Sequence, residues 1–287
     1  MRNQRLAISL MFAQAILFAI ETAMVHHIGP SVSVMQLSLL RSLAGVGVVV
    51  AIARNQTVFQ TDQLPLQLLR GLVAVSYSWV MMYSFARLPY ADATAISCTQ
   101  AIYIVVFSAA LLDERITLLR CAAVGVGVVG AALIVKPTFL EYNVYYLVAL
   151  LGTSLNGLAF VMNKYAQRRG EPPLTTMFYA NAVPVLCNLP LLPMTGFPAL
   201  ELWPWLSGVL LFGPIGMYLG IKAVKYDQAS TLGPYTLLRL VMGIGVGILV
   251  FREMPDLLAS VGVAAILMSC FLSVAQRFPE TPRTVSR

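Results

Sequence analysis

Charged residues are scarce in this sequence, and their scarcity excludes most soluble proteins. Asp, Glu, Lys and Arg make up 11% of the 287 residues, whereas a soluble domain carries about 25%. Hydrophobic residues make up 59%, and apolar runs of about 20 residues, the length that crosses a bilayer as a helix, recur along the chain. Such a chain could not cover its apolar surface in water. The sequence therefore predicts a multi-pass membrane protein and excludes a soluble enzyme or a disordered chain.

Disulfide modules and catalytic motifs are also lacking. The four cysteines fall in or beside apolar runs, without the spacing of a disulfide framework: Cys98, Cys121, Cys187 and Cys270. The metalloprotease, serine hydrolase and Walker A motifs are absent from the sequence. We therefore expect no catalytic residue, no metal ligand, no cofactor and no ATP site. The net charge of +7 comes from basic residues scattered in twos and threes, which predicts no nucleic-acid partner.

One dinucleotide-type glycine pattern occurs at residues 125–130, in the middle of an apolar run. A nucleotide site would need a strand before the glycines and a wet helix N-terminus after them. Small residues inside a membrane helix instead allow a neighbouring helix to approach closely. The pattern therefore predicts helix packing.

Ten apolar segments predict ten transmembrane helices, because a segment in lipid must satisfy its own backbone hydrogen bonds. The predicted spans are 6–26, 33–53, 67–87, 91–111, 117–136, 144–165, 174–194, 202–222, 229–250 and 255–275. The loops between them are too short for a soluble domain. If the N-terminus is cytoplasmic, fourteen of the nineteen Lys and Arg residues lie inside, three outside and two within spans. Cytoplasmic loops are enriched in Lys and Arg, so both termini are expected in the cytoplasm.

Two stretches of the sequence are similar to each other. Residues 86–115 and 223–254 both begin with Ala, a basic residue, Tyr, Asp and small residues, and both run through an apolar span to a glutamate, Glu114 or Glu253. One more span follows each stretch, so the repeating unit has five spans and the second copy is inverted in the membrane. The sequence predicts two inverted halves, residues 1–140 and 141–287, with a substrate site between them, as in alternating-access transporters.

Four features together resemble the ten-helix EamA branch of the drug/metabolite transporter superfamily. They are Arg41 in the second span, an Ala-x-x-x-Tyr-Ala-x-Ala turn at residues 86–93, a related turn at 226–229, and the glutamates that end spans four and nine. Within this branch the chain is most similar to bacterial aromatic amino-acid exporters, which implies export across the bacterial inner membrane. The chain departs from the branch at Gln100, where many members have proline, and Arg239 stands at the matching place in span nine.

Three ionisable side chains fall well inside spans, where charge is costly and usually faces an interior cavity. Arg239 is about 15 Å deep at 1.5 Å per residue, and we expect it to bind a substrate carboxylate or to contact Glu21 or a backbone carbonyl. Glu21 is expected to pair with Arg41 or Arg239, with proton coupling and binding of a substrate amine as alternatives. Arg41 matches a position shared across the family, so it is expected to serve the scaffold.

Polar and aromatic side chains that share faces of several spans predict the wall of the substrate cavity. Amides at mid-depth should point inward, because burying them in lipid is unfavourable. The predicted substrate-binding residues are Gln14, Phe18, Glu21, Ser76, Trp79, Tyr83, Gln100, Tyr103, Asn156, Phe160, Asn163, Tyr218, Tyr235 and Arg239.

The sequence as a whole predicts an all-α polytopic secondary transporter that exports amino acids, aromatic or apolar ones favoured, and related metabolites. One alternative is an exchanger of nucleotide sugars or sugar phosphates, which should carry several mid-span Lys or Arg residues; only Arg239 clearly qualifies. A membrane-embedded enzyme would need a nucleophile–base pair or a metal cluster, and the sequence shows none. We expect a small-molecule substrate and membrane lipid as partners, and a monomer.

Overall fold

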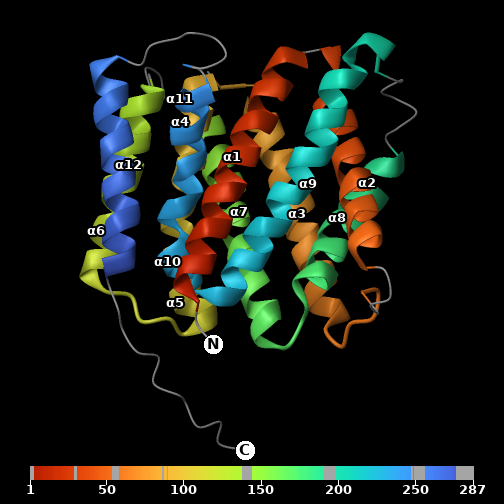
Figure 1. Ribbon diagram of the computed structural model, residues 1–287, viewed down its shortest axis with the longest axis horizontal. Helices are drawn as coiled ribbons and strands as arrows, with labels where there is room; N and C mark the ends of the chain where they lie inside the picture. The colour runs from red at the N-terminus through yellow and green to blue at the C-terminus, as the bar shows by residue number, and fades with distance from the viewer. Residues whose placement is uncertain are drawn as a thin grey trace, which may run out of the picture.

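The chain folds into helices that run roughly parallel to one another (Figure 1). The computed structural model describes residues 3–28, 31–53, 58–85, 87–88, 90–137, 144–190, 198–246, 248 and 256–275. The α-helices are α1 (Gln4–Ile28), α2 (Val34–Ala53), α3 (Leu64–Phe85), α4 (Tyr90–Cys98), α5 (Gln100–Leu112), α6 (Leu118–Val135), α7 (Tyr145–Arg168), α8 (Pro173–Asn188), α9 (Trp203–Tyr226), α10 (Ala229–Leu232), α11 (Leu238–Val246) and α12 (Leu257–Ala275). Two 3-10 helices, η3 (Leu200–Leu202) and η4 (Pro234–Leu237), precede α9 and α11. Over this part of the chain there is no strand, which confirms the predicted all-α class.

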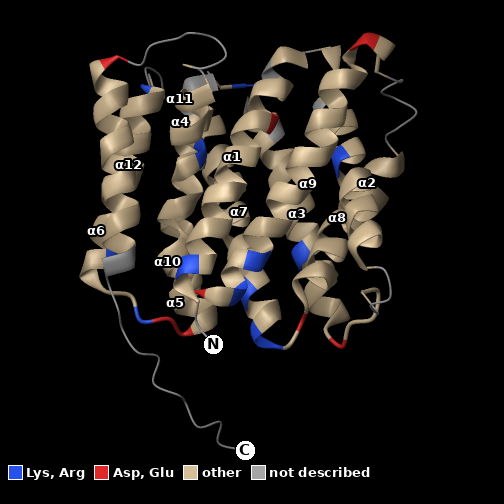
Figure 2. Cartoon of the chain, in the orientation of Figure 1, with Lys and Arg blue, Asp and Glu red and all other residues tan. Residues whose placement is uncertain are grey.

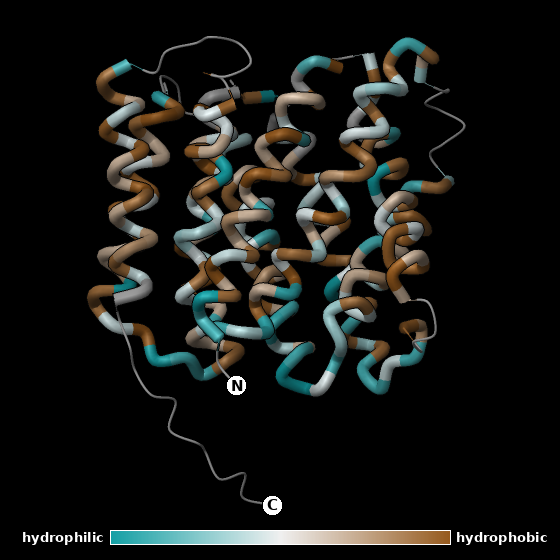
Figure 3. The backbone as a smooth tube through the Cα atoms, in the orientation of Figure 1, coloured by the Kyte–Doolittle hydropathy of each residue, from teal (hydrophilic) through white to brown (hydrophobic). Residues whose placement is uncertain are grey.

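The helices are mostly apolar in the middle of the bundle, and hydrophilic residues are most frequent at its two ends (Figure 3). Within the described residues, six helical stretches are long and apolar enough to cross a membrane, one of them made of α4 and α5: Gln4–Val25, Met35–Ala53, Ala93–Leu112, Leu118–Val135, Tyr145–Arg168 and Leu200–Tyr226. Large apolar side chains such as Val129 and Phe271 lie exposed on the outside of the bundle, where lipid would cover them. The structure therefore supports a multi-pass membrane protein, while the number of ten crossings stays a prediction.

Helices from distant parts of the sequence pack side by side. We call residues 3–137 the N-terminal part and residues 144–275 the C-terminal part. Helix α1 packs mainly against α9, α6 against α12, α2 against α8, and α3 against α7. Each of these pairs takes one helix from each part, so the two parts are interleaved (Figure 1).

The α6–α12 pair is held at short range by glycine, as the pattern at residues 125–130 predicted. A Cβ added at Gly130 would lie 2.8 Å from the carbonyl oxygen of Gly262, and one added at Gly262 would lie 2.5 Å from that of Gly130. Real Cβ atoms do not approach carbonyl oxygens so closely, so the helices could not pack this way with larger residues. Gly125, by contrast, faces open space.

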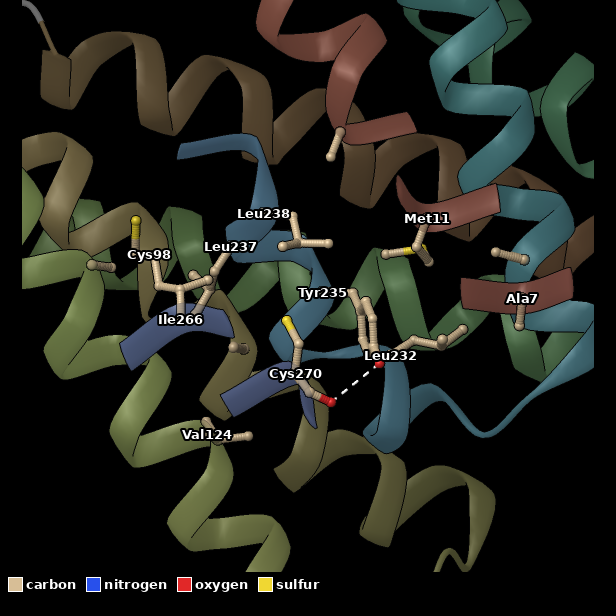
Figure 4. Close-up of a cluster of buried hydrophobic side chains, with 14 of the residues drawn as sticks. Ala7, Met11, Cys98, Val124, Leu232, Tyr235, Leu237, Leu238, Ile266 and Cys270 are labelled. Carbon is tan, nitrogen blue, oxygen red and sulfur yellow. Dashed lines mark hydrogen bonds between the residues drawn. The ribbon is translucent and has the colours of Figure 1, made fainter. Parts of the chain in front are cut away.

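The largest apolar core lies where α1, η4 and α12 meet (Figure 4). Met11 of α1, Leu237 of η4 and Ile266 of α12 are almost completely buried in it. Tyr235 belongs to the same cluster, with its ring beside Leu232 and its hydroxyl directed at α12 (Figure 4). This core fixes the C-terminal part of the chain against the first helix.

Two predicted spans are not continuous helices, which corrects the sequence interpretation. The predicted span 91–111 is divided at Thr99 into α4 and α5, and the predicted span 229–250 begins as α10, η4 and α11. Near the first break the hydroxyls of Ser97 and Thr99 donate to the carbonyls of Thr94 (2.7 Å) and Ile96 (2.6 Å), bonds that compete with regular helix geometry. At the second break, Pro234 has no backbone N–H and so cannot donate a helical hydrogen bond.

Some residues used in the sequence argument lie outside the described part of the chain. They include Ala86 in the first repeat turn, Glu253 in the second repeat, and six of the arginines counted for topology: Arg2, Arg54, Arg252, Arg277, Arg283 and Arg287.

Candidate functional site

The two interrupted helices meet in the interior of the bundle. A Cβ added at Gly233, between α10 and η4, would lie 3.4 Å from the carbonyl oxygen of Ala101 in the first turn of α5 and 3.5 Å from Ile104. The stretch from α4 to α5 runs toward the end of the bundle where α1 begins, whereas α10 to α11 runs away from it (Figure 1). The break in the N-terminal part and the break in the C-terminal part therefore lie next to each other in the interior of the bundle.

Four polar side chains beside these breaks form what we call the polar band: Ser97, Gln100, Asn156 and Arg239. The Nη2 of Arg239 donates to the Oγ of Ser97 at 3.2 Å, which links α11 to α4. The Nδ2 of Asn156 donates to the Oε1 of Gln100 at 2.9 Å, which links α7 to α5. Ser97 and Gln100 are three residues apart across the first break, so the band runs from α11 through α4 and α5 to α7.

Arg239 has an unusual electrostatic position in this band. Among the described residues no carboxylate forms a salt bridge with it; its polar neighbours are the hydroxyl of Ser97, which accepts its hydrogen bond, and the thiol of Cys98. A guanidinium presents five N–H donors in a planar fork that matches a carboxylate. The band can therefore accept an anionic group without displacing an existing ion pair.

Aromatic side chains lie next to the band on α5 and α7. The rings of Tyr103 and Phe107 are stacked, with centroids 6.3 Å apart. Phe160, one turn beyond Asn156 on α7, packs against the buried cluster formed by residues of α5, α7 and α10. The predicted residues Gln100, Tyr103, Asn156 and Phe160 thus lie on two adjacent helices, α5 and α7.

Glu21 forms the expected ion pair with Arg41. The Nε of Arg41 lies 2.6 Å from the Oε1 of Glu21, and the guanidinium also lies 5.7 Å from the ring centre of Phe18. The pair is pressed against α9, because a Cβ added at Gly213 would lie 2.4 Å from the Oε1 of Glu21. The pairing of Glu21 with Arg41 is confirmed, and it leaves Arg239 without this carboxylate.

The rest of the predicted face of α1 also packs on glycines of α9. A Cβ added at Gly216 would lie 2.8 Å from the ring of Phe18, and one added at Gly220 would lie 2.5 Å from the amide of Gln14. Gly213, Gly216 and Gly220 share one face of α9. The structure thus places Gln14 and Phe18 at a close helix–helix contact.

The residues predicted on α3 lie apart from the polar band. Ser76, Trp79 and Tyr83 are exposed in the protein. The indole of Trp79 donates to the Oδ1 of Asn188 on α8 at 3.1 Å. Tyr83 lies edge-on to Tyr145 at the start of α7, with ring centres 5.6 Å apart.

Three other predicted residues have structural partners elsewhere. Asn163 is 7% exposed and accepts a hydrogen bond from the Nε of Arg70. Tyr218 lies under the ammonium group of Lys222, 5.6 Å from it. The hydroxyl of Tyr235 donates to the carbonyl of Cys270 at 3.1 Å within the apolar core (Figure 4).

The sequence interpretation missed a group of buried charges near one end of the bundle. Several Lys and Arg residues gather there together with acidic residues (Figure 2). Glu114 is buried against the start of α10, and Arg120 and Arg168 donate to groups around it. In the sequence Glu114 ends the first repeat stretch, and Arg120 and Arg168 are two of the basic residues on the predicted cytoplasmic side. Only the folded chain shows that they meet.

The chain was compared with known proteins. The EamA-like transporter family matches it twice, over residues 5–136 and 143–275. The chain is 27% identical to a pseudopaline exporter of Pseudomonas aeruginosa, over 88% of this chain and 90% of that protein. It is 26% identical to a riboflavin transporter of Brucella anthropi, over 78% and 81%, and 24% identical to an S-adenosylmethionine uptake transporter of Rickettsia prowazekii, over 70% and 69%.

A solved crystal structure has the same fold, with a TM-score of 0.78 and 17% sequence identity over 95% of this chain and 98% of that one. The named relatives are all transporters, which confirms a transporter and not an enzyme, but they do not support the narrower prediction of an aromatic amino-acid exporter. Because the family match covers nearly the whole chain, this protein belongs to the EamA-like transporter family.

Proposed function

We propose that this protein is a secondary transporter that exports amino acids, preferentially aromatic or apolar ones, and related small metabolites across the bacterial inner membrane. The observation that carries the proposal is the meeting of two interrupted helices beside the polar band. In secondary transporters, discontinuous helices in corresponding positions of two halves line the substrate site. We place the substrate between α4, α5, α7 and α11.

Alternating access between two inverted five-helix halves is part of the same proposal. The double family match divides the chain close to residue 140, in support of halves at 1–140 and 141–287. The opposite directions of α4–α5 and α10–α11 are those expected of inverted copies (Figure 1). Rocking of such halves around a central site would open it to each side in turn.

The chemistry of the polar band supports a substrate with a carboxylate and an adjoining apolar group. Arg239 offers a cation that no described carboxylate neutralises, and Gln100 and Asn156 offer amide donors and acceptors. Tyr103 and Phe160 supply the neighbouring aromatic surface. Export is supported by the relative named as an exporter, although another relative is named as an uptake transporter.

Exchange measurements in proteoliposomes test the proposal. Vesicles loaded with unlabelled substrate should accumulate labelled aromatic and apolar amino acids faster than empty vesicles. The panel should also contain sugar phosphates and the decarboxylated amines of the same amino acids. Exchange of sugar phosphates without amino acids would favour the alternative exchanger, and equal exchange of acids and amines would remove the role assigned to Arg239.

A further inference from the structure

A buried carboxylate ties the two parts of the chain together at the end of the bundle where α1 begins. Glu114 follows α5, and its side chain is 1% exposed. It accepts hydrogen bonds from the backbone N–H groups of Ala229 (3.1 Å) and Ser230 (3.0 Å) at the start of α10, and from the hydroxyl of Ser230. Hydrogen bonds to an ionised acceptor are stronger than neutral ones, so this contact holds α5 firmly to α10.

Two arginines extend the contact to α6 and α7. The Nη1 of Arg120 donates to the Oγ of Ser230 at 2.8 Å, and its Nη2 donates to the Oε1 of Gln228 at 2.6 Å. The Nη2 of Arg168 lies 3.6 Å from the Oε1 of Glu114, and its Nη1 donates to the carbonyl of Leu112. We call Glu114, Arg120, Arg168 and Ser230 the polar lock.

An apolar cluster lies directly next to the polar lock on its inner side. It consists of Ile104 and Leu112 of α5, Val161 of α7 and Ala229 of α10, all buried. Along α5 the order is Gln100 in the polar band, then Ile104 and Leu112, then Glu114 in the lock. The apolar cluster therefore separates the polar band from the end of the bundle.

We propose that the polar lock and this apolar cluster form the gate that closes the substrate site toward the end of the bundle where α1 begins. This inference rests on the proposed transport function, because a gate requires a site that alternates between two sides. Every bond of Glu114 to α10 joins α5 to α10, so these bonds must break when the two helices move apart at this end of the bundle. A substitution that weakens them shifts the population toward the state open at this end.

Cysteine labelling tests the gate without any substrate. Val161→Cys is introduced into a protein whose four native cysteines are replaced by alanine, and the protein is placed in lipid nanodiscs, where a charged maleimide reaches both ends. Val161 is 0% exposed, so the parent should react slowly. Glu114→Gln should raise the labelling rate by about tenfold or more, because the amide removes the negative charge and places an NH2 donor opposite at least one of the backbone N–H donors of α10.

Two matched controls separate gate opening from loss of structure. Asp62→Asn removes an exposed carboxylate at the same end and should leave the rate unchanged. Val49→Cys reports on an equally buried valine in a different apolar cluster, formed with Leu174 and Met177 of α8, and it should stay protected in Glu114→Gln. Selective labelling at Val161→Cys therefore supports the gate.

An unchanged rate at Val161→Cys in a folded Glu114→Gln protein would overturn the gate. If Glu114→Gln exposes both reporters, the milder variant Ser230→Ala is tested in its place. Ser230→Ala removes one hydrogen-bond donor to Glu114 and one acceptor of Arg120, and it keeps the backbone bonds to Glu114. Ser230→Ala should then raise labelling at Val161→Cys alone, by a few fold; no rise, or a rise at both reporters, rejects the gate. Because the assay contains no substrate, the proteoliposome exchange measurement judges the proposed function separately.

Discussion

Arg239 is a partly buried cation that contacts the hydroxyl of Ser97 and the thiol of Cys98, and its role can be tested by substitution. Arg239→Ala should weaken transport of a carboxylate-bearing substrate by about tenfold to a hundredfold, because a hydrogen bond to a charged group contributes about 1.5–3 kcal/mol. Arg239→Lys should restore only part of the activity, since Lys lacks the planar fork. The measurement is the KM for proteoliposome uptake.

Ser97→Ala is the matched control for Arg239, because it removes the hydroxyl acceptor and keeps the cation. It should change the KM far less than Arg239→Ala. Normal uptake by a correctly inserted Arg239→Ala protein would show that the guanidinium does not bind the substrate.

A second prediction at the residue scale concerns the contribution of the Glu21–Arg41 ion pair to thermal stability. Arg41→Leu leaves the carboxylate of Glu21 unpaired against α9 and should lower the melting temperature in detergent. Combining it with Glu21→Leu removes both charges, so the double variant should melt at a higher temperature than Arg41→Leu alone. If the second substitution lowers the melting temperature further, the pair is not the reason for the loss.

At the scale of single elements, the α6–α12 contact is the most sensitive to side-chain size. Gly130→Ala places a methyl group 2.8 Å from a backbone oxygen of α12, and such overpacking typically costs about 1–3 kcal/mol. Gly125→Ala on the same helix points into open space and should be neutral or slightly stabilising. Thermal unfolding of the two variants, followed side by side, measures the difference; equal melting temperatures would contradict the close contact.

The sequence predicted most helices well and missed their interruptions. The predicted span 255–275 is close to α12 (Leu257–Ala275), because a long apolar run between polar residues defines an apolar helix. Hydropathy could not show the break at Thr99, since Ser and Thr hydroxyls bond to carbonyls in continuous helices as well. Hydropathy also could not show that Pro234, which has no backbone N–H, begins η4.

The candidate site was only partly predictable for a related reason. The mid-span amides Gln100 and Asn156 were expected to point inward, and the structure places them in contact. Helical periodicity shows which residues share a face, but it does not show which helix that face meets. The face of Gln14 and Phe18 therefore looked like a cavity wall, whereas it meets the glycines of α9.

At the scale of the whole molecule, the distribution of Lys and Arg predicts the orientation. Reporter fusions after Asn55, Gly170 and the C-terminal residue should lie in the cytoplasm, and fusions after Pro30 and Phe197 should lie in the periplasm. The reason is that loops rich in Lys and Arg are retained in the cytoplasm. Helix α1 begins and α12 ends at the same end of the bundle, as an even number of crossings requires (Figure 1). A periplasmic C-terminal reporter would contradict both the ten crossings and the inverted halves.

The interleaving of the two parts has a consequence for how the protein is made. While the N-terminal part emerges from the ribosome, Arg70 has neither Asn163 nor the carbonyl of Thr176, its partners in the finished protein. Gln67 likewise lacks its hydrogen-bond acceptor Glu171 at that stage. A newly inserted N-terminal part must therefore bond these groups to water or lipid headgroups until translation of the remaining helices supplies their partners.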